Sequence, residues 1–565
     1  MMLQTQTWWK EGIVYQIYPR SYRDTTGNGI GDLRGIIEKL DYIASLGVDI
    51  IWLNPIYDSP NDDNGYDIRD YRKIMSEFGT MDDFDELLSG MKARGLRLVM
   101  DLVVNHCSDE HEWFKESRTS RDNPYRDYFH WWPAEKGTPP KRWSYFDVEE
   151  NAWQYDKQTD AYYLHYFAVK QPDLKWENPK VRAEIYDMMH FWFKKGVDGF
   201  RMDVIPFLSK DINYPEIDAK EPHEYIAYYA NGPKVHEYLN ELNNEVISKY
   251  DAFTVGEGPG ISIDDALDFV HEDRKEMDMF FHFDLMSLDR APGEVFKMRE
   301  GGYSLTEFKK VFTDWDAAFA KAGWGSLFLA NHDFPRTVSR WGNDTQEHWR
   351  NSATLLQTFL LTMRGTPYFY QGDEIGMTNV RFTDIEDYRD INTINRYETV
   401  KNRGGDLDAF MDSEQHAARE NARTPMQWDQ TENAGFTSGT PWIKLNEDYK
   451  VGVNTKDQLN KKDSILSYFK QMTALRKKHQ ALVYGAYECI KPEDEQVYCY
   501  TRTLESERFL VLLNFSEDTA QFSLPLSVSY NRKIKVISND KIIDDKTFKE
   551  FTLRPWQAIV YRLEN

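Results

Sequence analysis

Eight apolar runs, each bounded by turn residues, recur over the first two-thirds of the chain. Most are continuously apolar rather than alternating, which is typical of strands buried on both faces of a parallel sheet. Amphipathic helical patterns lie between them, for example over 36–47 and 84–95. The runs cover 14–19, 49–57, 96–106, 197–204, 252–257, 278–285, 326–333 and 366–376. Eight strand–helix units in series predict an α/β fold built on a (β/α)8 TIM barrel.

Breaks in this pattern predict the domain boundaries. Residues 107–177 are rich in Trp, Tyr, Asp and Pro without clear periodicity, and we expect a small inserted subdomain after the third strand. The barrel then comprises 1–106 and 178–485, with a second insertion at about 377–440 after the eighth strand. From 486 to 565 short alternating runs predict a C-terminal antiparallel β-sandwich domain.

Three of the apolar runs end abruptly in a carboxylate, at Asp203, Glu257 and Asp333. Burying a carboxylate at the end of a hydrophobic strand is costly unless the charge is paired or used. In a barrel the C-terminal strand ends share one face, so these side chains can converge with His106 and His332 on one pocket. For one Asp a simple strand-end cap is the better explanation, but for the set it is improbable.

Such a set suits cleavage of a glycosidic bond, which needs one acid to protonate the leaving oxygen and a second carboxylate at the sugar carbon. Arg201 lies two residues before Asp203, so both side chains point to the same side of a strand. A cation there favours the ionised form of Asp203, as a nucleophile requires. Glu257, in the Gly-flanked string VGEGPG, is the candidate general acid.

Charge and cysteine content exclude several other classes. The formal net charge of −24 argues against nucleic acid and anionic membranes as partners. Three cysteines without metal-ligand spacing suit a reducing compartment. We see no signal peptide and no membrane-spanning run, and therefore expect a cytoplasmic monomer that acts on a small oligosaccharide without an organic cofactor.

The strings around these residues resemble glycoside hydrolase family 13, the α-amylase superfamily, close to the oligo-1,6-glucosidases, dextran glucosidases and sucrose isomerases. They occur in order through most of the chain as DLVVNH (101–106), QPDLKW (171–176), GFRMDV (199–204), VGEG (255–258), NHDFPR (331–336) and ARTPMQWD (422–429). The resemblance implies a retaining α-glucosidase with Asp203 as nucleophile, Glu257 as acid/base and Asp333 as the clamp on sugar hydroxyls.

The resemblance also implies a subsite for the non-reducing glucose, in which Asp67 and Arg419 pair to make the pocket blind and the enzyme exo-acting. The other residues of this subsite are His106, Gln171, Arg201 and His332.

The segment 24–32 spaces oxygen donors like a calcium loop, at Asp24, Thr26, Asn28, the Ile30 carbonyl and Asp32. A turn rich in Gly and Asp is the competing explanation, because the closing Glu of an EF-hand is missing. The family resemblance implies a structural Ca²⁺ here.

The residue after the nucleophile resembles a linkage switch, and Val204 goes with α-1,6 preference. Two departures from the family pattern fall on the acceptor side. The segment 283–290 is closer to the sucrose isomerases, and Asn392 stands where the family usually has Glu. Against an isomerase, no aromatic follows Glu257, and Phe334 replaces the usual Asn.

The resemblance therefore implies an exo-α-1,6-glucosidase for isomaltose and short isomalto-oligosaccharides. A sucrose isomerase or transglucosidase, or an α-1,4-preferring maltase, are alternatives. A non-catalytic sugar-binding barrel is a third class, which the presence of all three carboxylates disfavours.

Overall fold

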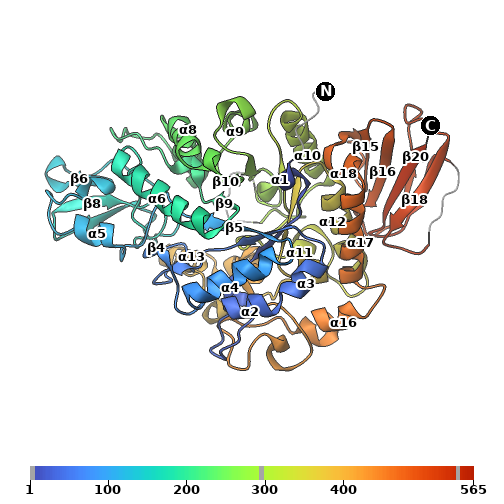
Figure 1. The fold of residues 1–565 in the computed structure, drawn as a ribbon, viewed down its shortest axis with the longest axis horizontal. Helices are drawn as coiled ribbons and strands as arrows, with labels where there is room; N and C mark the ends of the chain where they lie inside the picture. Colours follow the sequence, from blue (N-terminus) through green and yellow to red (C-terminus); the bar gives the residue numbers. More distant parts are fainter. Residues whose placement is uncertain (1–6, 292–297, 543–547, 565) are drawn as a thin grey trace.

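A parallel eight-stranded sheet forms the centre of the computed structural model, which describes residues 7–291, 298–542 and 548–564 (Figure 1). Its strand order is β11-β10-β9-β5-β2-β1-β13-β12. A hydrogen bond from Ser326 Oγ to the Phe280 carbonyl, 2.8 Å long, links the two end strands β12 and β11. The strands are β1 (Val14–Ile17), β2 (Ile50–Leu53), β5 (Arg97–Leu102), β9 (Gly199–Met202), β10 (Phe253–Gly258), β11 (Met279–His282), β12 (Ser326–Leu327) and β13 (Thr366–Tyr370).

Each of the eight predicted apolar runs overlaps one of these strands, and the predicted TIM barrel is confirmed. Almost every strand residue is buried, because helices cover the outer face and side chains fill the interior. All the strands except β10 are shorter than their runs, since the residues at the ends of the runs leave the sheet at its C-terminal end. Those loop residues form the site described below.

Helices surround the barrel and are capped by residues that the sequence makes recognisable. In α6 (Pro179–Lys195), Asn178 accepts a hydrogen bond from the Lys180 amide and Gly196 ends the helix in the left-handed conformation. The helical pattern at 36–47 is divided at Lys39 into two short helices. The other barrel helices include α2 (Leu33–Glu38), α3 (Leu40–Ser45), α4 (Met81–Lys92), α7 (Pro222–Tyr229), α8 (Val235–Glu245), α9 (Ile263–Val270), α10 (Leu305–Phe319), α11 (Thr337–Trp341), α12 (Trp349–Thr362) and α17 (Ile465–Lys478).

Between β5 and α6 the chain leaves the barrel and forms a small layer at its edge, on the left in Figure 1. This layer contains α5 (Glu112–Ser117) and an antiparallel sheet of β6 (Trp131–Pro133), β8 (Ala161–Leu164) and β7 (Trp153–Asp156). An isolated bridge between His106 and Asp173 ties its two ends to the end of β5.

After β13 the chain makes a second excursion over the same end of the barrel. It contains α13 (Ile391–Asn402), α14 (Leu407–Ala417) and the short α15 (Glu420–Arg423). These helices bring arginines and an asparagine to the site, far in sequence from the catalytic strand ends.

The C-terminal part is an antiparallel β domain, drawn in red in Figure 1. A five-stranded sheet has the order β14 (Ala486–Ile490), β15 (Val497–Leu504), β16 (Glu507–Asn514), β20 (Ala558–Glu564) and β18 (Arg532–Ser538). A second sheet pairs β17 (Ala520–Ser523) with β19 (Glu550–Leu553). The boundaries given above for the separate domains stay predictions. Within the described ranges, no helix combines the length and apolar character needed to cross a bilayer.

Candidate active site

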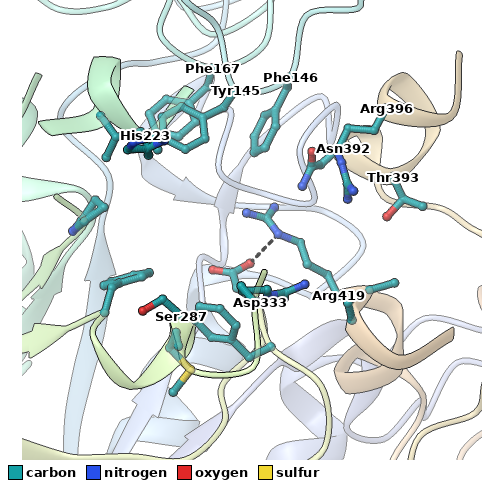
Figure 2. Close-up of a pocket in the computed structure, with 18 of the residues that line it drawn as sticks. Tyr145, Phe146, Phe167, His223, Ser287, Asp333, Asn392, Thr393, Arg396 and Arg419 are labelled. Carbon is teal, nitrogen blue, oxygen red and sulfur yellow. Dashed lines mark ion pairs between the residues drawn. The ribbon is translucent and has the colours of Figure 1, made fainter. Parts of the chain in front are cut away.

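A cavity of about 340 Å³ opens at the C-terminal ends of the barrel strands. Figure 2 shows Tyr145, Phe146 and Phe167 on one side of it, with Asp333 and Ser287 opposite. The first three belong to the insertion after β5, so that insertion supplies an aromatic wall against which a sugar ring can pack. Predicted site residues that line the cavity are Val204, Glu257, Asp333 and Arg419.

Arg201 lies at the centre of the charged residues below the cavity. Its Nη1 donates hydrogen bonds of 2.8 Å to Asp203 Oδ1 and to Asp101 Oδ1. Its Nη2 lies 2.7 Å from Glu257 Oε2. The predicted contact between Arg201 and Asp203 is present, and the same guanidinium also joins Glu257, so the structure brings the two candidate catalytic carboxylates together.

One guanidinium cannot neutralise three carboxylates. Burial raises the pKa of Asp203 well above its usual value; Arg201 lowers this pKa, and Glu257 and Asp101 raise it further. Burial and the neighbouring carboxylates therefore outweigh Arg201 and raise the pKa of Asp203, which differs from the expectation that the cation keeps this group ionised.

Asp333 lies in the opposite electrostatic environment. Burial raises the pKa of its carboxyl, but the guanidinium charges of Arg419 and Arg423 outweigh burial and lower this pKa below its usual value. Arg419 Nε lies 3.2 Å and Arg423 Nη2 3.0 Å from Asp333 Oδ1. Asp333 is therefore an anion held in place, suited to accept hydrogen bonds from sugar hydroxyls.

His106 and Gln171 meet beside the acidic residue Asp63. Gln171 Nε2 donates to Asp63 Oδ2 at 2.9 Å and lies 3.3 Å from His106 Nε2. Burial lowers the pKa of His106 to about 3, so its ring is neutral. Burial raises the pKa of Asp63 to about 8, although Arg419 works to lower it. These groups supply neutral donors and acceptors around the space where a terminal glucose would bind.

The predicted pairing of Asp67 with Arg419 is wrong. The Asp67 carboxylate is fully buried and accepts hydrogen bonds from Ser59 Oγ and from the backbone amides of 62 and 63. Arg419 instead pairs with Asp333 and lies 3.7 Å from Asp390 Oδ2. Asp67 thus shapes the turn that contains Asp63, and Asp63, not Asp67, is the acid that contacts Gln171.

His332 lies in the barrel centre beside Tyr66. Its Nε2 is 2.6 Å from Tyr66 Oη and 3.2 Å from Asp333 Oδ2, and the two rings stack with centroids 5.2 Å apart. Burial lowers the pKa of His332 well below its usual value, so the ring is neutral. The Tyr66 hydroxyl also donates to Asp101 Oδ2 at 2.9 Å.

Sequence reasoning missed residues that lie inside the matched strings or near them. Asp101 opens the string DLVVNH, and Arg423 lies inside ARTPMQWD. Arg423 holds Asp333 and also donates to Asp390 Oδ2 at 2.6 Å. A charged residue within an otherwise apolar run was the available signal for Asp101. The residues missed were Asp63, Tyr66, Asp101, Asp390 and Arg423.

The cavity lining also contains the two acceptor-side departures from the family pattern. Asn392 lines it, as do Ser287 and Arg290 of the segment 283–290, and Figure 2 labels Asn392 and Ser287. Phe334 lines it as well. Asn392 is buried, and within the described chain its Oδ1 has no hydrogen-bond partner. A leaving sugar would meet a neutral amide at this position.

The loop at 24–32 folds as a hydrogen-bonded turn. Asp24 accepts hydrogen bonds from the amides of Thr26, Gly27 and Gly29, and Asp32 caps α2 through the Gly35 amide. Gly29 has a positive φ, and a Cβ there would lie 1.9 Å from the Thr440 carbonyl oxygen, so chain packing requires this glycine. Across the described ranges, no group of three or more His, Cys, Asp or Glu is arranged to hold a metal ion.

Residues 16–485 match the family model for the alpha amylase catalytic domain, and 487–560 match the model for the maltogenic amylase C-terminal domain. The chain therefore belongs to the α-amylase family and is a glycoside hydrolase.

Relatives match it over nearly their whole length. The oligo-1,6-glucosidase of Parageobacillus thermoglucosidasius is 53% identical, with 99% of each chain covered. The trehalose-6-phosphate hydrolase of Bacillus subtilis (strain 168) is 45% identical, over 100% of this chain and 99% of the other. A solved variant of isomaltulose synthase from Erwinia rhapontici NX5, in complex with sucrose, superposes with a TM-score of 0.96 at 44% identity, over 99% of this chain and 100% of that chain.

Proposed function

We propose that the protein is a retaining, exo-acting α-glucosidase that hydrolyses the non-reducing α-1,6 bond of isomaltose and short isomalto-oligosaccharides. The observation that carries this proposal is the contact of one guanidinium, that of Arg201, with both Asp203 and Glu257, of which Glu257 lines the cavity. The high identity to curated oligo-1,6-glucosidases supports the substrate class.

In the first step, Asp203 attacks the anomeric carbon while Glu257 gives its proton to the glycosidic oxygen, and the leaving sugar departs. In the second step, Glu257 takes a proton from water, and the water oxygen attacks the same carbon. The bond to Asp203 breaks, which releases glucose and regenerates the Asp203 carboxylate. Asp333, held anionic by Arg419 and Arg423, accepts hydrogen bonds from ring hydroxyls as charge develops on the sugar.

The terminal glucose would be held by Asp63, His106, Gln171 and His332. Val204 lines the cavity next to the nucleophile, where its branched side chain limits the volume open to the leaving sugar. Such a volume difference discriminates between linkages by a factor of about 10–200.

The substrate proposal is tested by supplying isomaltose, maltose and sucrose separately at equal concentration and separating the products by anion-exchange chromatography. We expect rapid release of glucose from isomaltose and slow release from maltose. Faster cleavage of maltose, or conversion of sucrose into an isomer, would replace this substrate by one of the alternatives.

The catalytic assignment has its own test. The variant Asp203→Asn keeps the shape of the side chain but removes the nucleophile, and kcat on isomaltose should fall by about 10⁴-fold or more. Hydrolysis at the parent rate in this variant would overturn the assignment.

We also propose a structural Ca²⁺ at the 24–32 loop, supported by oxygen donors at alternate positions from Asp24 to Asp32. Bound Ca²⁺ would stabilise the loop and take no part in the chemistry. Metal analysis of the purified protein should find one Ca²⁺ per chain, and EDTA should lower Tm without changing the initial rate at 25 °C. If the purified protein contains no calcium and EDTA does not change its Tm, the segment is a turn that binds no metal.

A further inference from the structure

Val204 adopts a backbone conformation that is rare for its side chain. Its φ and ψ are 36° and 41°, in the left-handed region, although the residue is β-branched and buried. Such a conformation is strained for a β-branched residue and persists only where the surroundings impose it. It directly follows Asp203 and precedes the 3-10 helix η4 (Ile205–Phe207).

This conformation points the Val204 amide at Glu257. The N–H donates to Glu257 Oε2 at 3.2 Å, the same oxygen that lies 2.7 Å from Arg201 Nη2. Within the described part of the chain, Glu257 Oε1 accepts no hydrogen bond. The two oxygens of the Glu257 carboxyl group therefore have different surroundings. Oε2 accepts a hydrogen bond from the residue that follows β9, whereas Oε1 is available to a ligand in the cavity that Glu257 lines.

A carboxyl proton on Oε2 would face the Val204 N–H and the positive charge of Arg201 and be repelled by both. The neutral form of Glu257 must then carry its proton on Oε1, from which it can pass to the glycosidic oxygen. We propose that Val204 is a positioning residue whose strained backbone keeps the proton of the general acid on Oε1. This proposal rests on the proposed role of Glu257 and adds a second role for Val204 besides its side-chain volume.

The test compares substrates that differ in their need for a proton. Isomaltose has a poor leaving group that must be protonated, whereas α-glucosyl fluoride releases fluoride with little proton assistance. Replacing Val204 by its α-hydroxy acid analogue, which has an ester in place of the amide, removes the N–H and keeps the side chain. We expect kcat/KM for isomaltose to fall about 10-fold or more, and that for α-glucosyl fluoride to stay within about 3-fold.

Equal loss on both substrates, or no loss on isomaltose, would overturn the proposal. If the ester variant does not fold, Val204→Gly provides the test. This variant keeps the N–H but removes the side chain that restricts the backbone at this position. Val204→Ala, which keeps a Cβ, is its matched control. Gly should show the selective loss relative to Ala, and equal behaviour of the two variants on both substrates would contradict the proposal.

A separate variant distinguishes this proposal from the function itself. Glu257→Ala should lower kcat/KM for isomaltose far more than kcat/KM for α-glucosyl fluoride if Glu257 is the acid, because kcat/KM reports only the first step, in which the leaving group departs. A non-selective loss there would remove the proposed role of Glu257. A selective loss there, with an unselective effect at Val204, would remove only the positioning role.

Discussion

Arg419 Nε lies 3.2 Å from Asp333 Oδ1, so an arginine after the last barrel strand fixes a carboxylate that follows the seventh (Figure 2). The pair joins the excursion after β13 to the catalytic end of the barrel. Because Arg419 is among the groups that lower the pKa of Asp333, it contributes both to the position and to the charge of this carboxylate.

Removing this cation should impair catalysis by changing Asp333. In Arg419→Ala the pKa of Asp333 should rise, so the acid limb of the pH–activity profile should shift to higher pH. Loss of a charge-assisted contact should also reduce kcat/KM for isomaltose by about 10²–10³-fold. A pH–rate profile measures both effects.

The matched control is Arg381→Ala, which removes an exposed arginine paired with Asp344. It should leave the profile unchanged. If the acid limb of the pH–rate profile in Arg419→Ala matches that of the parent, Arg423 alone is sufficient to keep the pKa of Asp333 low.

Asp63 should make stability depend on pH. Its pKa in the folded protein is about 8, against an ordinary value of 3.8. The folded state therefore keeps a proton that the unfolded chain loses, so this contribution is complete below about pH 4 and is lost as the pH rises through 8. Asp63→Asn stays neutral, and its Tm should exceed that of the parent at pH 9 but not at pH 5.

The neighbouring Asp62→Asn provides the control, since Asp62 is partly exposed and paired with Lys170 at 3.2 Å. Thermal unfolding at both pH values, followed by circular dichroism, gives the comparison. Equal Tm shifts for Asp63→Asn at pH 5 and pH 9 would show that Asp63 is ionised in the folded protein. The same variant should lose activity on isomaltose, because Asp63 belongs to the proposed glucose subsite and accepts a hydrogen bond from Gln171 Nε2.

The sequence was sufficient to predict the barrel, because buried parallel strands leave continuous apolar runs, and it singles out three carboxylates, because an acid at the end of such a run is conspicuous; the catalytic roles of these carboxylates stay predictions. It was not sufficient to choose between Asp63 and Asp67. Both lie in one polar turn, and only the folded loop shows that Asp67 binds the backbone of that turn. The roles of Arg419 and Arg423 depend on the path of the chain after β13, which no local pattern reveals.

Gly258, which follows the proposed acid, is required by packing. A Cβ there would lie 1.8 Å from Phe280 Cε1, on the neighbouring strand β11. Gly258→Ala should lower the free energy of unfolding by about 1–3 kcal/mol and reduce activity by displacing Glu257. Urea unfolding and kcat on isomaltose measure the two effects.

The double variant Gly258→Ala with Phe280→Leu tests the cause. Leu lacks the ring atoms that meet the new Cβ, so the double variant should recover part of the stability and activity lost by Gly258→Ala. Phe280→Leu alone should destabilise the core through lost packing. Additive losses in the double variant would mean that the clash with Phe280 is not responsible.

Asn392 should contribute to binding of the leaving sugar and not to the chemistry at the first glucose. Its buried Oδ1 has no hydrogen-bond partner in the described chain, so a hydroxyl of the leaving sugar can donate to it at little desolvation cost. Asn392→Ala should raise KM for isomaltose about 10-fold, while kcat/KM for α-glucosyl fluoride, which has no leaving sugar, stays within about 2-fold. Steady-state kinetics on the two substrates measure this difference.

Asn244→Ala, at an exposed position on α8, is the control for Asn392→Ala. A parallel loss on both substrates would place the effect of Asn392 at the catalytic residues instead.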